Sequence, residues 1–148
     1  MEFFVRPHRI SRISPSFRKH CSLSRRAQGA VIANIRDWLE KYLEIESILF
    51  LDEKDFAFAY PAGFPRQVQS FVDVEAAAVD LRDAWDLGLD CIENLTSLLE
   101  DRGIKVGIVD ADDDFDACTF DAEDDRRIMV IVVRSGIPGD RQRFSLAH

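Results

Sequence analysis

The sequence predicts an α+β domain, in which three helices pack on a small, mostly antiparallel sheet of three strands. Two observations predict this class. Apolar residues recur at helical spacing over much of the chain up to Gly103, whereas after it they follow the spacing of strands. The chain has 148 residues, 47% of them hydrophobic, which is enough for one domain with a buried core.

Residues 1–23 are expected to form a basic, extended arm. Pro7 and Pro15 interrupt regular structure there, because proline fixes φ and lacks a backbone N–H. Residues 1–28 contain seven Lys and Arg side chains against one acid, a net charge of +6, and the rest of the chain carries −14. We therefore divide the chain into this arm and an α+β domain over residues 24–148.

The first helix is expected over about residues 24–47, where Ser22 or Ser24 can supply the N-cap oxygen. Apolar residues spaced by three or four positions place one stripe on this helix. The stripe consists of Val31, Ile35, Trp38, Leu39, Tyr42 and Ile45.

An irregular connector is expected over residues 50–71, which contain Pro61, Gly63 and Pro65 and show no sustained period. Exposing several aromatic rings would be costly, so we expect the phenylalanines of the connector to tuck against the core. They are Phe50, Phe56, Phe58, Phe64 and Phe71.

Two shorter helices follow the connector. Asp73 is expected to cap the first of them, and Gly88 to end it. Its apolar face consists of Val74, Ala78, Leu81 and Trp85. The next helix is expected over about residues 92–102 and ends at Gly103. Its buried positions are Ile92, Leu95, Leu98 and Leu99.

Three strands are then expected over residues 104–109, 115–120 and 127–133, separated by acidic or polar turns. The third is apolar on both sides, which predicts a central place in the sheet. Asp140 is expected to cap a short fourth helix, whose apolar positions include Phe144 and Leu146.

Composition excludes several classes of protein. The net charge of −8 argues against direct binding of nucleic acid, because phosphate contacts supply most of that affinity. The longest apolar run, residues 128–133, is far shorter than the ~20 residues of a membrane span. No nucleic-acid or membrane partner is therefore expected.

Cys21, Cys91 and Cys118 form an odd set without metal-ligand spacing, which indicates a reducing compartment. The Arg- and Ser-rich first residues resemble a transit peptide but lack the apolar core of a secretory signal. We expect a cytoplasmic protein.

The acidic stretch of residues 110–125 imitates a calcium loop through Asp110, Asp112 and Asp114. Such a loop needs glycine at its sixth position and glutamate at its twelfth, where this chain has Phe115 and Asp121. We therefore expect solvated turns rather than a calcium site.

No catalytic residue is predicted from local patterns. Gly-rich phosphate loops and nucleophile elbows are absent from the sequence. Cys21 is adjacent to His20, but neighbours in sequence do not acquire the geometry of a thiol–imidazole pair. His8 lies in the basic arm, where we expect it to be exposed.

The last eleven residues, Pro138 to His148, resemble the segment that leads into the zinc helix of ImmA/IrrE-type metallopeptidases. The resemblance extends over nearly the whole chain, at lower specificity. Its other parts are Phe3–Pro7 and Phe17–Lys19, similar to the connector after a helix-turn-helix module, and Trp85–Gly88, Gly103–Val106 and Phe115–Asp116.

This resemblance implies a zinc peptidase fold that is often attached to a DNA-binding domain and cleaves a repressor. The family continues with Glu-Leu-Gly-His, so that two histidines four residues apart bind zinc and the glutamate polarises a metal-bound water. His148 corresponds to the first zinc ligand. Val133 and Ala117 depart from the family pattern, which commonly has asparagine and glycine there.

The general base and the remaining ligands would lie beyond His148. We therefore expect a truncated member of the family that is inactive as this chain, with zinc bound only in an extended chain. Its expected partners are a protein substrate or a helix-turn-helix regulator. The alternative is a non-enzymatic interaction module associated with a transcription regulator.

Overall fold

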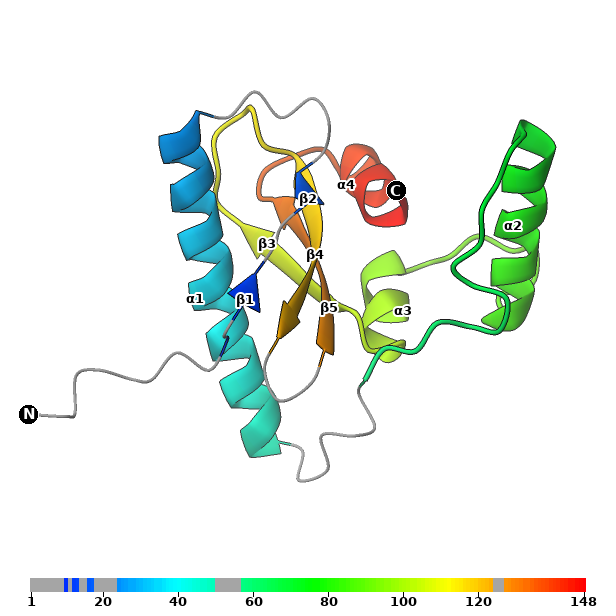
Figure 1. Ribbon diagram of the computed structural model, residues 1–148, viewed down its shortest axis with the longest axis horizontal. Coiled ribbons are helices and arrows are strands. Elements are labelled where there is room, and N and C mark those ends of the chain that lie inside the picture. Colours follow the sequence, from blue (N-terminus) through cyan, green and yellow to red (C-terminus); the bar gives the residue numbers. More distant parts are fainter. Residues whose placement is uncertain (1–9, 11, 14–15, 18–23, 50–56, 124–126) are drawn as a thin grey trace, which may run out of the picture. The chain divides into compact units, whose positions relative to one another are not determined.

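The computed structural model describes residues 10, 12–13, 16–17, 24–49, 57–123 and 127–148 (Figure 1). The described residues form two compact units, one from residues up to 58 together with 95–148, the other from residues 59–94. The elements are β1 (Arg12–Ile13), β2 (Ser16–Phe17), α1 (Arg25–Leu49), α2 (Phe71–Ala84), α3 (Leu95–Asp101), β3 (Lys105–Val109), β4 (Ala117–Glu123), β5 (Arg127–Arg134) and α4 (Gly139–Ala147).

The sheet confirms the predicted α+β class. Its three longer strands lie in the order β4-β5-β3, and the two-residue strands β1 and β2 both pair with β4. Strand β5 is central, as its apolar sequence predicts; it runs parallel to β3 and antiparallel to β4. Of the strand pairings in the described residues, only that between β3 and β5 is parallel.

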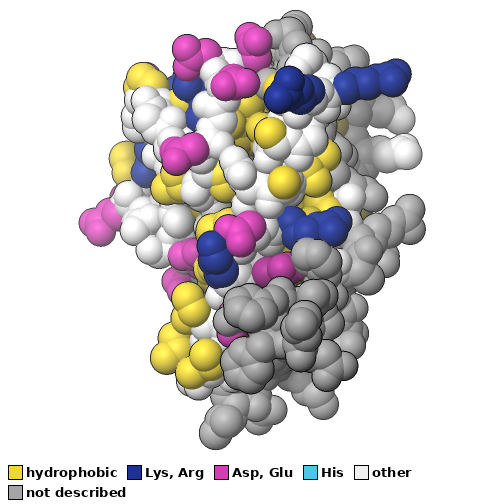
Figure 2. Space-filling view, turned by 90° about the vertical axis from the view of Figure 1, so that its left-hand side faces the viewer, with side chains coloured by type: hydrophobic (Ala, Val, Ile, Leu, Met, Phe, Trp, Pro, Cys, Tyr) yellow, Lys and Arg dark blue, Asp and Glu magenta, His cyan; other side chains and the backbone are white. Residues whose placement is uncertain are grey.

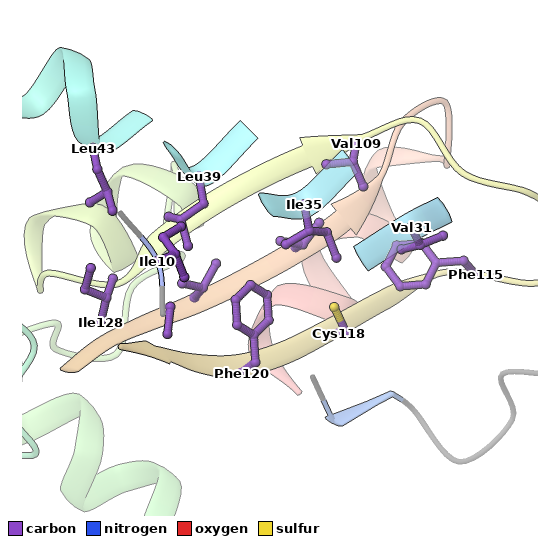
Figure 3. Close-up of a cluster of buried hydrophobic side chains, with 13 residues drawn as sticks. Ile10, Val31, Ile35, Leu39, Leu43, Val109, Phe115, Cys118, Phe120 and Ile128 are labelled. Atoms are coloured by element: carbon purple, nitrogen blue, oxygen red, sulfur yellow. The ribbon is translucent and has the colours of Figure 1, made fainter. Parts of the chain in front are cut away.

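Helix α1 covers one face of this sheet (Figure 3). Every fourth residue of the helix points at the strands, and these residues meet the even-numbered side chains of β4 and β5, because strand side chains alternate between faces. The resulting core contains Val31, Ile35, Leu39 and Leu43 from α1, Cys118, Phe120 and Ala122 from β4, Ile128, Val130 and Val132 from β5, and Ile10, Val109 and Phe115.

Helices α3 and α4 lie on the other side of the sheet (Figure 1). The odd-numbered residues of β5 face this side, and Ile131 and Val133 are buried there. Leu99 of α3 and Leu146 of α4 are buried as well. The central strand is therefore covered on both faces by helices.

The outer side of α1 carries acidic and basic side chains interspersed with hydrophobic ones (Figure 2). One predicted stripe position is wrong. Ile45 is 58% exposed, whereas Leu43 and Glu46 are buried. The buried residues of α1 follow one another at intervals of four up to Leu43. Four residues are slightly more than one turn, so the buried side rotates along the helix and Ile45 no longer faces the sheet.

The basic arm lies largely outside the described residues, but its described parts belong to the sheet. Ile10 is only 1% exposed within the core, and β1 and β2 are extended and pair antiparallel with β4.

Of the predicted connector, residues 57–70 contain no helix or strand. Phe58 and Phe64 are partly buried, while Phe71 begins α2 and is 91% exposed, so the prediction that it tucks against the core is wrong.

Helix α2 begins one turn earlier than predicted. Ser70, not Asp73, is its N-cap: the Ser70 hydroxyl accepts from the Asp73 N–H at 3.2 Å, and the Asp73 carboxylate accepts from the Ser70 N–H at 2.9 Å. This reciprocal pair is a capping box. Hydrogen bonds from the Gln69 N–H and from Ser70 hold the pKa of Asp73 below its ordinary value.

The C-terminal end of α2 and the N-cap of α4 also differ from expectation. Helix α2 ends at Ala84, with Trp85 as its C-cap, and Asp86 then takes the left-handed φ of 56° two residues before the predicted stop at Gly88. Gly103 ends α3 as predicted, with a φ of 83°. The N-cap of α4 is Pro138 without a side-chain hydrogen bond, so Asp140 is not the cap but lies in the first turn, where a carboxylate favours the helix dipole.

None of the helices in the described part of the chain is both long enough and apolar enough to cross a membrane.

One close approach in the core was not predicted. The ring of Trp38 in α1 lies against the backbone of Gly107 in β3, and a Cβ added there would come within 2.9 Å of ring atoms. Trp38 also packs against Tyr42, with ring centroids 5.5 Å apart. Glycine at position 107 therefore lets the helix lie flat on β3.

We predict that Gly107→Ala lowers the free energy of unfolding by about 1–3 kcal/mol, because the ring must move to admit the methyl group. Gly29→Ala is the matched control, since no atom lies within 4 Å of its added Cβ. Alanine favours the helix more than glycine, so this variant should gain up to about 1 kcal/mol. Urea denaturation measures both, and equal stability of Gly107→Ala and the wild type would contradict the close contact.

Candidate functional site

The predicted zinc ligand, His148, lies at the C-terminal end of α4. Its backbone N–H donates to the Phe144 carbonyl at 3.1 Å, and its ring stacks on the Phe144 ring with centroids 5.9 Å apart. Both side chains are exposed. The imidazole is thus positioned by the helix and open to solvent.

Two contacts position α4. Leu146 is buried on the second face of the sheet, and the Arg141 guanidinium donates to Asp116 Oδ2 at 2.6 Å. Asp116 immediately precedes β4, so this ion pair joins the first turn of α4 to the beginning of that strand. His148 follows Leu146 by two residues, which turns it about 200° around the helix axis and away from the buried side.

A polar network surrounds the beginning of α4, where β3 and β5 end. The Ser135 hydroxyl donates to Asp110 at 2.5 Å, and Arg134 donates to Asp113 at 2.5 Å. The Arg134 N–H also donates to the Asp116 carbonyl at 2.8 Å. The network therefore ties the β3–β4 loop to the end of β5 and, through Arg141, to α4.

Three buried atoms of this region have no hydrogen-bond partner: Asp116 Oδ1, Arg134 Nε and Ser145 Oγ. Ser145 is one turn beyond Arg141, so both lie on the same side of α4. These buried polar atoms distinguish the region from the apolar core.

The described residues do not supply a complete site for catalytic zinc. Catalytic zinc needs three protein ligands, and His148 supplies one. The described residues contain no group of three or more His, Cys, Asp or Glu side chains that could hold a metal ion. Asp140, in the first turn of α4, lies about two turns from His148, too far to share a metal with it.

The acidic positions that imitate a calcium loop serve the polar network instead. Asp110 accepts from Ser135, and the carbonyl of Asp112 accepts from the Phe115 N–H at 2.9 Å in a tight turn. Among the cysteines, Cys118 is buried in the core and Cys91 is exposed, and neither forms a disulfide with a described residue. His8, His20 and Cys21 lie outside the described residues.

A second cluster of charged groups was missed from the sequence. Lys105, the first residue of β3, forms a buried ion pair with Glu46 near the end of α1. Their side chains are 4% and 7% exposed. The Lys105 ammonium also lies 5.3 Å from the centre of the Tyr42 ring, a cation–π contact. This pair anchors the end of α1 to the beginning of β3.

The surroundings of the pair shift two pKa values. Burial, together with the nearby charges of Glu100 and Glu46, raises the pKa of Tyr42 from 10.0 to about 12. Burial also raises the pKa of Glu100, although the charge of Lys105 opposes that change.

No protein-family model matches the chain, and neither does any curated protein or solved structure. The functional interpretation therefore rests on the chain's own residues and their geometry.

We predict that Tyr42 ionises with a midpoint near pH 12, measured as tyrosinate absorbance. The neutral phenol of Tyr42 is favoured in the folded state, because its folded pKa is raised above 10.0. The resulting contribution to the free energy of unfolding is complete below pH 10 and is lost as the pH rises from about 10 to 12. Tyr42→Phe should remove the late-titrating component and Tyr60→Phe should retain it. Persistence of that component in Tyr42→Phe would contradict the assignment.

Proposed function

We propose that this chain is the part of an ImmA/IrrE-like metallopeptidase domain that leads into its zinc helix. We further propose that residues 1–148 alone do not hydrolyse peptide bonds. The observation that supports the assignment is the position of His148, exposed at the end of a helix whose other side is buried on the sheet. Zinc, when bound in an extended chain, would polarise a water for attack on a peptide carbonyl.

The geometry of α4 supports this proposal in one further respect. Residues four apart lie on the same side of a helix, so a second histidine four residues after His148 would share its exposed side. Phe144 lies four residues before His148, and its ring stacks on the imidazole, which limits the orientations of the imidazole. Leu146 and the Arg141–Asp116 ion pair hold in place the helix that carries Phe144 and His148.

We predict that appending Glu-Leu-Gly-His after His148 tightens zinc binding at least about tenfold over the unextended chain, because two imidazoles then face one ion. The matched control is the same extension ending in alanine, which lacks the second imidazole. Isothermal titration calorimetry measures all three chains, and His148→Ala in the extended chain should remove the gain.

Equal zinc affinity of the three chains would contradict the proposed role of α4. The unextended chain should also release no peptides from denatured casein in the presence of zinc. Cleavage that a chelator abolishes would contradict the proposed inactivity.

A second candidate function is a non-enzymatic module that binds a protein, such as a transcription regulator. One observation favours it: α2 contains no buried residue, and several large apolar side chains of its unit are exposed. Exposed apolar side chains that gather on one surface are typical of sites of protein interaction.

A further inference from the structure

Helix α2 is apolar on two opposite sides. On one side Leu81 and Trp85 are partly buried. On the other side lies an apolar strip that we define as Val72, Ala76 and Val79. Exposed apolar side chains that gather on one side of a helix are typical of a surface that contacts another protein.

The strip is nevertheless exposed. Val72 is 72% exposed and Val79 is 50% exposed, and Phe71, the first residue of the helix, is 91% exposed. Val72 and Val79 are seven residues apart, which places them on the same side of the helix about 10 Å from each other. This is the spacing at which one helix contacts a second helix packed along it.

The strip belongs to a well-ordered helix rather than to a frayed segment. The capping box of Ser70 and Asp73 fixes its beginning. Arg66 pairs with Asp80 at 2.6 Å, and Arg82 donates to the carbonyls of Gly88 and Asp90 at 2.7 and 2.5 Å. The helix and the segments on both sides of it are thus tied together, and the strip is presented on a preformed surface.

The charge around the strip selects its partner. Glu75 and Asp83 lie beside the strip and are exposed. Residues 59–94 contain seven acids and two arginines, a net charge of −5. Both arginines, Arg66 and Arg82, bind groups of the same unit. A second copy of the strip would bring the same acids together, and like charges in an interface oppose association.

We propose that this strip docks a basic amphipathic helix of a partner protein, whose apolar residues cover Val72 and Val79 and whose Lys or Arg side chains pair with Glu75 and Asp83. This inference rests on the second candidate function, to which it gives a partner class, and it is independent of the zinc proposal. Contact with the apolar side chains of the strip supplies the affinity for the partner helix. The charges of Glu75 and Asp83 determine how that helix is oriented on the strip.

The test uses the full chain and three labelled synthetic peptides of about four helical turns. The first is a Leu/Lys peptide with leucine at i, i+3, i+4 and i+7. The second has the same composition in an order without an apolar face, and the third replaces lysine by glutamate. Fluorescence anisotropy at physiological salt measures binding, and we expect the first peptide to bind at least about tenfold more tightly than the other two.

Two variants locate the binding. Val72→Ser/Val79→Ser should weaken binding of the first peptide at least about tenfold, while the matched control Ile45→Ser/Ile48→Ser, on exposed residues of α1, should not. Glu75→Lys/Asp83→Lys should weaken the Leu/Lys peptide and strengthen the Leu/Glu peptide. This reversal cannot arise from misfolding, and urea denaturation checks that each variant still unfolds cooperatively.

Four results would overturn the proposal. One is equal binding of the first two peptides, which indicates charge attraction without docking. Another is loss of binding in the α1 control. The third is a dimer in sedimentation that Val72→Ser/Val79→Ser dissociates, which would make a second copy the occupant. A cooperatively folded chain that binds none of the peptides overturns the partner class but leaves the interaction module itself standing.

Discussion

Strand β5 is apolar on both faces, and the unit that contains the sheet is organised by the need to cover both. Its even-numbered residues are covered by α1 and its odd-numbered residues by the side that carries α3 and α4. Each fully buried Val or Ile side chain contributes about 1.5–3 kcal/mol relative to exposure. Exposing either face would therefore remove several such contributions from a protein of ordinary, marginal stability.

This constraint decides where His148 lies. Leu146 must face the sheet to cover the odd-numbered residues of β5, so His148, two residues later, faces solvent. The polar network around Arg134 and Asp116 fixes the beginning of the same helix, so both ends of α4 are positioned by the unit that contains the sheet.

The sequence predicted the features that depend on local pattern: the central place of β5 and the glycine that ends α3. Of the two apolar positions predicted for α4, Leu146 is buried and Phe144 is exposed. The sequence did not predict features that depend on which elements meet. Glu46 and Lys105 look like solvated residues until the topology buries them against each other. Phe71 looks like a core residue, yet it begins a helix that leaves it exposed. His148 was found only through a resemblance, because one histidine carries no spacing signal.

We propose that α4 is the beginning of a metal-binding helix. The first measurement to make is to sequence the source gene through the codon for His148 and the next four codons, whether or not a stop codon intervenes. We expect this stretch to encode Glu-x-x-His in the same frame, which would place a second histidine one turn after the first. A stretch that encodes neither the glutamate nor the second histidine would contradict it.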